Sequence, residues 1–301
     1  MLANLPPIHK YLPLIIGQNI GKQRLERVPE PSAITDDASH VLQYDQVMTT
    51  KLAIAYMIAI EQIYRCRPEP FGGTAIDLAC GPGHMSLCMA KHLKLDQLIG
   101  VDLSEPMIEI ANRNARECDI DAAAFRVGDV TDLHDLADGS CELSTFCDAA
   151  HHLSGLGTVR RVINELDRIT SEDGLIFIMD LVRLRTAKIT ETYAQLLGAD
   201  YVRHGLEFFY RDFHNSMHAA WTTSELKRAV PESSSRNWFQ VFPVGLPAIQ
   251  LLIAVPCGQR SLYARNSSPW DTSGPPIGNV HYQDWWALRQ LLRLSRPRQL
   301  H

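Results

Sequence analysis

The sequence lacks the cysteine patterns that build a zinc framework or a set of disulfides. Its 301 residues include seven cysteines, an odd number, and no two of them form a Cys-x-x-Cys pair. Structural zinc and paired cysteines are therefore not expected, and reduced thiols are the default for such a chain. We predict a cytoplasmic protein without a metal site.

Long apolar runs and an excess of basic charge are also missing. No apolar run approaches the ~20 residues that a membrane-spanning helix needs. The first ten residues show no basic region followed by an apolar stretch, so we expect no secretory signal. Lys and Arg number 29 against 34 Asp and Glu, a net charge of −5. This balance argues against a nucleic-acid partner, and the 46% hydrophobic content is enough for a sizeable core.

What the sequence does contain is one informative stretch, residues 75–83 (AIDLACGPG). It predicts a short buried strand that ends near Asp77 and breaks into a turn at Gly81 and Gly83, followed by a helix over Met85 to Leu93. Glycine has no Cβ, so a ligand can approach the backbone of such a turn closely. The start of the helix offers free N–H groups. The arrangement favours a nucleotide-like ligand.

Two interpretations compete for this stretch. Gly81, Gly83 and Ser86 come close to the dinucleotide fingerprint G-x-G-x-x-G/A, with Asp102 at about the expected spacing of ~20 residues. The third glycine is absent, however, and Asp77 would stand close to a pyrophosphate. The run D-L-A-C-G-P-G instead resembles the first motif of class I S-adenosylmethionine-dependent methyltransferases, of the small-molecule "type 11"-like kind. Two alternatives remain: an NAD(P)-dependent oxidoreductase, and a strand-turn-helix that binds no ligand.

The rest of the pattern predicts a doubly wound α/β fold. Further strands are expected over Gln97 to Val101, Ala123 to Val127, Cys141 to Cys147 and Leu175 to Asp180, with a final hairpin over Trp238 to Val244 and Ala248 to Val255. The resemblance, which covers roughly residues 74–255, implies a Rossmann-like sheet of seven strands, mostly parallel with one antiparallel strand.

Three parts are expected along the chain. Residues 1–70 form an N-terminal arm, irregular up to about residue 35, and cap helices. Residues 71–256 form the cofactor-binding domain, in which residues 184–221 are inserted as a helical lid over the substrate. Residues 257–301 form a C-terminal loop and a helix over Tyr282 to Leu294.

The resemblance also implies which residues bind the cofactor, S-adenosylmethionine. Asp102 would accept hydrogen bonds from the ribose hydroxyls, Asp129 would receive the adenine amino group, and Met107 would lie against the ring. Tyr44, on a cap helix, would reach the cofactor from above. The other expected cofactor residues flank the same strand ends: Asp77, Ala79, Gly81, Gly83, Leu103 and Val130.

The chemistry is expected after the fourth strand, at D-A-A-H-H-L, which resembles the H-H-L of quinone-type and related methyltransferases. His151 and His152 are the candidate general bases, since histidine titrates near neutral pH. No [N/D]-P-P-[Y/F] motif follows this strand, so a small-molecule acceptor is favoured over a nucleic acid. Polar and aromatic residues of the lid are the candidate substrate contacts: Tyr210, Arg211, His214, Asn215 and His218.

Two further alternatives stay open at this stage. The C-terminal helix carries Trp285 and Trp286 beside several arginines, which leaves room for a homodimer or for a non-catalytic cofactor-binding subunit of another enzyme. The many Asp and His residues also leave room for a metal-dependent O-methyltransferase, although the sequence shows no compact group of ligands.

Overall fold

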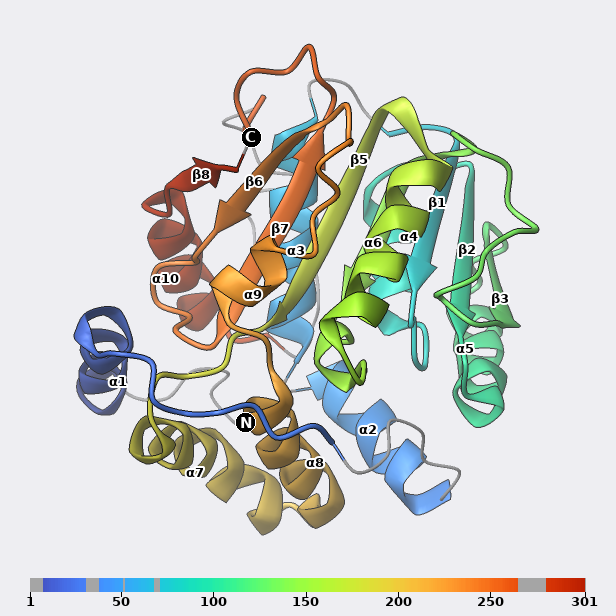
Figure 1. The fold of residues 1–301 in the computed structure, drawn as a ribbon. Helices are drawn as coiled ribbons and strands as arrows, with labels where there is room; N and C mark the ends of the chain where they lie inside the picture. The colour runs from blue at the N-terminus through green and yellow to red at the C-terminus, as the bar shows by residue number, and fades with distance from the viewer. Residues whose placement is uncertain (1–7, 31–37, 51, 68–70, 265–279, 301) are drawn as a thin grey trace.

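A computed structural model describes residues 8–30, 38–50, 52–67, 71–264 and 280–300 (Figure 1). Its centre is an eight-stranded sheet in the order β3-β2-β1-β4-β5-β7-β6-β8. The strands are β1 Thr74–Leu78, β2 Gln97–Asp102, β3 Ala123–Val127, β4 Cys141–Cys147, β5 Thr170–Leu181, β6 Asn237–Val241, β7 Ile249–Val255 and β8 Pro297–Gln299.

The first five strands run parallel, and β7 runs antiparallel to β5. The class of fold and the single antiparallel strand within the final hairpin are therefore confirmed. Strand β8 is an addition that the sequence analysis did not anticipate: it pairs with β6 through Phe239 and Gln299 and extends the sheet to eight strands. Strand β5 is also longer than expected, because it begins at Thr170 and not at Leu175.

Helices cover both faces of the sheet (Figure 1). On one face lie α3 Ala53–Cys66, α4 His84–His92 and α5 Glu105–Glu117; on the other lie α6 Leu156–Ile169 and the short α9 Thr223–Lys227. Helix α6 buries a stripe that includes Val159, Val162 and Leu166, the 3.6-residue period of a helix packed on a sheet. Helix α9 begins with a capping box between Thr222 and Glu225. This reciprocal pair satisfies two backbone N–H groups at the start of the helix.

A third group of helices lies beyond the carboxyl ends of the strands: α1 Ile8–Ile20, α2 Ala38–Thr50, α7 Ala187–Arg203 and α8 Glu207–Ala219. The prediction of an irregular arm up to residue 35 was wrong for its first part, which forms α1. Tyr11 and Leu14 are buried against Tyr193 and Leu184, and this packing holds the helix despite Pro13 within it. Residues 31–35 lie outside the described residues.

The C-terminal helix, α10 Tyr282–Arg293, packs on the main core through Trp285, Leu288 and Leu292. Its Arg289 forms an ion pair with Glu61 of α3, 3.1 Å between Nε and Oε1. Trp286 is about half exposed. Within the described residues, no helix combines the length and the apolar character needed to cross a bilayer.

Candidate active site

The glycine turn after β1 is held in a left-handed backbone conformation. Ala79, Gly81 and Gly83 have φ values of 53°, 52° and 79°. A Cβ on Gly83 would lie 2.8 Å from the ring of Phe125, so this position admits only glycine without rearrangement. A Cβ on Gly81 would meet only Tyr44, at 3.7 Å. Gly83 thus lies on the side of the turn that packs against Phe125, whereas Gly81 and Tyr44 border the space on the opposite side.

Asp102 joins this turn to the next helix. Its Oδ2 accepts a hydrogen bond from the backbone N–H of Gly81 at 2.8 Å, and its Oδ1 accepts one from the N–H of Ser104 at 2.9 Å. Ser104 is the N-cap of α5. A carboxylate has about four acceptor positions, so two donors from the backbone leave capacity for hydroxyl groups of a ligand. The carboxylate is fixed in place before any ligand arrives.

Asp77 lies beneath the turn and faces the protein interior. It is 2% exposed and accepts hydrogen bonds from the hydroxyls of Ser86, at 2.5 Å, and Thr145, at 2.6 Å. Burial raises the pKa of Asp77 to about 6, because the loss of hydration outweighs the two donors. Asp77 therefore connects β1, α4 and β4, and it does not line the cavity described next.

A cavity of about 1540 Å³ opens at the carboxyl ends of the strands, beneath α1, α2, α7 and α8. Most of the predicted cofactor residues line it together: Tyr44, Ala79, Gly81, Asp102, Leu103, Met107, Asp129 and Val130. His151 and His152 line it as well, as do Arg211 and Asn215 of the lid. The structure thus brings the two predicted halves of the site, cofactor and catalytic, into one space.

The other three predicted substrate residues do not line this cavity. His214 is bound to Glu191 of α7, 2.9 Å between Nε2 and Oε2, and its ring lies 5.0 Å from that of His218. Tyr210 packs against Gly198 of α7, where a Cβ would lie 2.0 Å from its ring. These side chains pack between α7 and α8. The part of the lid that lines the cavity therefore consists of Arg211, Asn215 and residues that were not predicted from the sequence.

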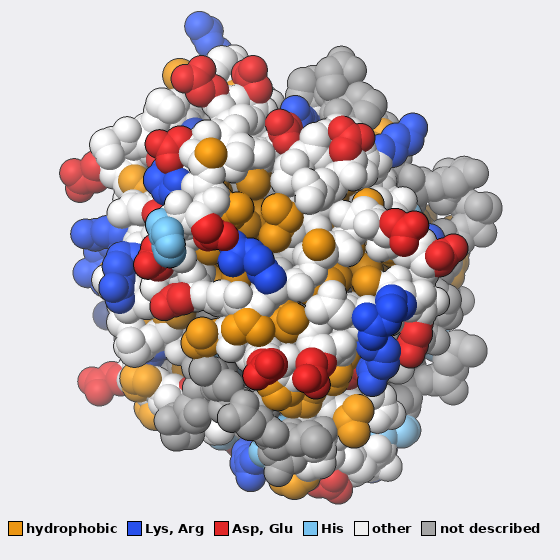
Figure 2. Space-filling model, turned by 90° about the vertical axis from the view of Figure 1, so that its right-hand side faces the viewer, with side chains coloured by type: hydrophobic (Ala, Val, Ile, Leu, Met, Phe, Trp, Pro, Cys, Tyr) orange, Lys and Arg blue, Asp and Glu red, His pale blue; other side chains and the backbone are white. Residues whose placement is uncertain are grey.

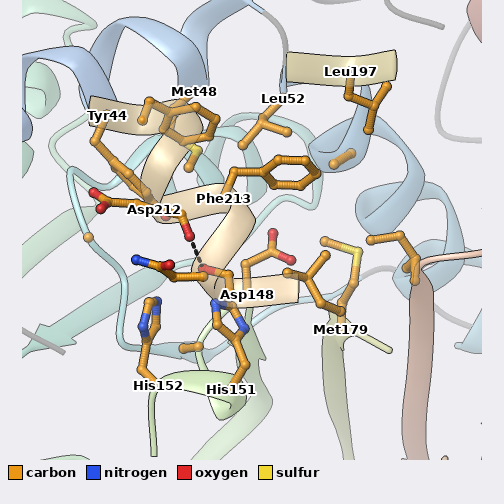
Figure 3. Close-up of a pocket in the computed structure, with 18 of the residues that line it drawn as sticks. Tyr44, Met48, Leu52, Asp148, His151, His152, Met179, Leu197, Asp212 and Phe213 are labelled. Atoms are coloured by element: carbon orange, nitrogen blue, oxygen red, sulfur yellow. Dashed lines mark hydrogen bonds between the residues drawn. The ribbon is translucent and has the colours of Figure 1, made fainter. Parts of the chain in front are cut away.

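The two histidines stand side by side in a short 3-10 turn, η1 Ala150–His152 (Figure 3), and each is held by a carboxylate. His151 is buried, and its Nδ1 lies 2.5 Å from Oδ1 of Asp180, at the end of β5. His152 forms a hydrogen bond through Nδ1 with Glu30. Burial lowers the pKa of His151, but the charge and hydrogen bond of Asp180, with Glu30 and Asp148 nearby, outweigh it, so the pKa is raised.

Glu30 belongs to an extended segment, residues 21–30, that crosses the site. Arg27 anchors this segment, since its guanidinium stacks on Trp221 at 3.8 Å and donates to the carbonyl oxygens of His151 and Leu153. Glu30 also accepts from Ser216 Oγ at 2.6 Å. Burial alone would raise the pKa of Glu30; the hydrogen bond and charge of His152 reverse this and lower it.

Asp148 is a further acidic group that the sequence analysis quoted but did not assign. It lines the cavity directly after β4, and its backbone N–H donates to Met179 O at 2.7 Å. Its φ of 52° is unusual for a residue other than glycine, and such strain gathers at functional sites. Burial, then the charge of Asp180, raise the pKa of Asp148 to about 7, although His151 opposes the shift. The D-A-A-H-H-L stretch itself could have indicated this residue.

The same neighbourhood contains a compact set of metal-ligand atoms, which the sequence did not show. Atoms of Glu30, His151 and His152 lie within 4.8 Å of one another. Two imidazoles and a carboxylate are a ligand set typical of transition-metal sites. Glu30 stands more than a hundred positions before the histidines, so no spacing rule applied to the sequence could have joined them.

The shape and chemistry of the turn fit a nucleoside ligand with adjacent hydroxyls. Asp102 offers a preorganised acceptor, Gly81 leaves the backbone accessible, and Leu103 and Met107 supply apolar surface beside it. The position of the third fingerprint glycine is occupied by Ser86, whose hydroxyl is bound to Asp77 below the turn. This arrangement agrees better with S-adenosylmethionine than with a pyrophosphate.

Comparisons with known proteins agree with this geometry. A family model described as "Methyltransferase domain" matches residues 76–178. The uncharacterized methyltransferase YcgJ of Bacillus subtilis is 30% identical over 115 residues, 38% of this chain and 42% of its own length. The uncharacterized methyltransferase C1347.09 of Schizosaccharomyces pombe is 30% identical over 122 residues, 37% of this chain and 40% of its own. The chain thus spans about two fifths of the length of these relatives.

Solved structures show the same fold over most of the chain. A putative S-adenosylmethionine-dependent methyltransferase from Methanococcus maripaludis has 19% identity and a TM-score of 0.55, covering 77% of this chain and 99% of its own. Geranyl diphosphate C-methyltransferase from Streptomyces coelicolor has 13% identity and a TM-score of 0.50, covering 82% and 98%. Residues 76–178 therefore match a methyltransferase domain, and the fold of the chain is that of these S-adenosylmethionine-dependent methyltransferases.

Proposed function

We propose that the protein transfers a methyl group from S-adenosylmethionine to a small-molecule acceptor. One observation carries the proposal: a single cavity is bordered by the glycine turn and Asp102 at one end and by the two carboxylate-held histidines beyond it. A transfer reaction needs the donor and the acceptor in one enclosed space, and orientation then supplies much of the rate.

On the cofactor side, each residue has one task. Asp102 accepts from the ribose hydroxyls, Asp129 accepts from the adenine amino group, and Leu103, Met107 and Val130 pack around the base. Tyr44 covers the turn at Gly81 and Ala79. When bound there, the cofactor would supply a methyl group on a sulfonium. An oxygen, nitrogen or carbon atom of the acceptor would take this methyl group, and the electron pair of the broken carbon–sulfur bond would stay on sulfur.

On the acceptor side, His151 takes the proton of the reacting group. Its Nδ1 is engaged by Asp180, so Nε2 is the nitrogen available to a bound molecule. The buried carboxylate fixes the orientation of the ring and stabilises the imidazolium that forms, the arrangement that general-base catalysis requires. His152, held by Glu30, is the second candidate for this role. Arg211 and Asn215 remain the proposed lid contacts to the acceptor.

The surface supports a small molecule as the acceptor. Figure 2 shows acidic and basic side chains interspersed over the face that carries β3 and α5, without a broad field of one sign on it. A nucleic-acid partner would be favoured by clustered basic residues. None of the seven cysteines is paired in a disulfide, which is compatible with the reducing cytoplasm proposed as its location.

The test compares ligands and then follows the methyl group. S-adenosylhomocysteine should raise the melting temperature, since a ligand that binds only the folded state stabilises it, whereas NAD and NADP should not. Radiolabelled S-adenosylmethionine, incubated with a small-molecule extract, should then yield labelled product with the native protein and little with the H151Q variant. Stabilisation by NAD alone would favour the oxidoreductase. Cofactor binding without any labelled product, from any extract, would favour the non-catalytic subunit.

A second mechanism is favoured by the clustered ligand atoms of Glu30, His151 and His152. A divalent ion held there would lower the pKa of an acceptor hydroxyl in place of a free histidine base. Elemental analysis of the purified protein and its activity after treatment with a chelator separate the two mechanisms. Stoichiometric metal and loss of activity on chelation, with recovery on adding the ion back, would replace the histidine base by the metal.

A further inference from the structure

The cavity is larger than one ligand requires. Pockets for a single small ligand measure roughly 300–1,000 Å³, whereas this one measures about 1540 Å³. The groups assigned to the cofactor occupy the end near β1, β2 and β3. A second chamber therefore remains, and its lining identifies the class of molecule that fits it.

This far chamber is lined by apolar side chains from elements on several sides. They come from α2 and α3 (Met48, Ile58), from the lid (Leu197, Phe213) and from the sheet (Met179, Ile249). Figure 3 shows Met48, Leu52, Phe213 and Leu197 on the side of the cavity opposite His151 and His152. Apolar walls on several sides favour an apolar occupant by roughly 25 cal/mol for each Å² removed from water.

The charged residues of the cavity have a clear distribution. Its lining includes three basic side chains among the described residues, Lys10, Arg203 and Arg211, and all three are exposed at the rim. The groups next to the histidines are acidic: Glu30, Asp148 and Asp212. An anionic group on the acceptor would be repelled by these acidic side chains.

The apolar chamber and the reacting groups meet at one point of the sheet. Cys147, at the end of β4, is paired in register with Met179 of β5. Asp148 follows Cys147, and Asp180 follows Met179. A molecule whose body lies against Met179 therefore presents its end to Asp148 and to His151, which Asp180 holds.

From these contacts we propose the class of acceptor: an uncharged, elongated apolar molecule that carries a weakly acidic hydroxyl at one end, of the alkylphenol type. The body fills the chamber between α3, α7 and α8, and the hydroxyl lies beside His151. This assignment rests on the proposed methyl transfer and adds the identity of the acceptor class to it.

The experiment uses para-alkylphenols of increasing chain length as probes. Their dissociation constants are measured by calorimetry with the full chain saturated with S-adenosylhomocysteine. For the native protein, each added methylene should strengthen binding by about fourfold, the equivalent of ~0.8 kcal/mol for a buried methylene. A para-alkylbenzoate of the same length should bind at least about tenfold more weakly than the phenol, because its carboxylate meets the acidic groups.

A blocking variant and a matched control test whether the dependence on chain length arises from binding in the chamber. Ala55, on α3, lines the chamber, and A55W should abolish the gain for long chains while the affinity for S-adenosylhomocysteine stays within about twofold. Leu42, on the exposed side of α2 and 54% exposed, provides the control L42W, which should behave like the native protein. If A55W does not fold, the smaller A55F replaces it.

The possible results test the acceptor class separately from the proposed methyl transfer. No dependence on chain length in the native protein, or the same dependence in A55W, overturns the proposed acceptor class; so does a benzoate that binds as tightly as the phenol. In each of these cases intact binding of S-adenosylhomocysteine leaves the proposed function standing. Failure of that ligand to bind the native protein would instead overturn the proposed function itself.

Discussion

The buried carboxyl of Asp77 should make the stability of the protein depend on pH. Its pKa in the folded state is about 6, against an ordinary value of 3.8. The folded state therefore binds this proton more tightly than the unfolded chain does. The stabilisation that results is fully present below the unfolded pKa and is lost as the pH rises through the folded pKa. Two units of pKa correspond to about 3 kcal/mol of the free energy of unfolding.

Replacing Asp77 by Asn removes this titration. The free energy of unfolding of D77N, relative to that of the native protein, should therefore increase as the pH rises. Between about pH 4.5 and about pH 7.5 the increase should be about 2 kcal/mol. The asparagine keeps the size of the side chain and can still exchange hydrogen bonds with Ser86 and Thr145. Its offset from the native protein at low pH then reports how well it replaces those contacts.

The measurement is urea unfolding of both proteins across this pH range, followed by circular dichroism and fluorescence. S86A supplies a control on the cause: without one of its two hydroxyl donors, the pKa of Asp77 should rise further and the native dependence on pH should steepen. A constant difference between D77N and the native protein at every pH would refute the reasoning. It would mean that the carboxyl is solvated in the folded protein.

Three other results are expected. D102A should raise the dissociation constant of S-adenosylhomocysteine about tenfold or more, since a charge-assisted hydrogen bond contributes ~1.5–3 kcal/mol; unchanged affinity in calorimetry would remove Asp102 from the ribose site. The lid, residues 184–221, should become more protected from hydrogen exchange when S-adenosylhomocysteine and an acceptor are both bound, and equal exchange would make it a fixed part of the body. D180N should lower the pKa of His151 in an NMR titration, because the carboxylate that stabilises the imidazolium is lost; an unchanged pKa would show that Asp180 does not hold the ring.

The sheet and the positions of the residues proposed for the cofactor could be predicted because both depend on local patterns. Short apolar runs alternating with amphipathic helices define the order of the parallel strands, and the carboxyl ends of such strands meet at one edge. Asp102 and Asp129 were therefore placed correctly at that edge from their positions alone. Asp77 also follows this rule along the chain, but its orientation depends on Ser86 and Thr145, contacts that the pattern does not contain.

Helical periodicity could have sorted the five predicted lid residues by the face of α8 on which they lie. Arg211 and Asn215 are four residues apart and line the cavity, whereas His214 and His218 are also four apart and lie together on another side of α8. Residues at this spacing share one face of a helix. The five lid residues could thus have been divided into two faces from the sequence. Which face meets the cavity depends on the packing of Tyr210 against Gly198, and this contact appears only in three dimensions.

The carboxylate partners of the two histidines could not be predicted from the sequence. Their positions also limit what similar proteins can indicate about the substrate of this chain. Residues 76–178 contain Asp102, Asp129 and both histidines, and this is the part that matches the methyltransferase domain. Asp180, Glu30 and most of the apolar chamber come from segments outside it. The matched part therefore contains the residues proposed for the cofactor and the proposed base, whereas the residues that orient the base and most of those that line the apolar chamber lie outside it. Similarity over the matched part alone carries no information on these outer residues, so the acceptor must be sought from the chamber of this chain itself.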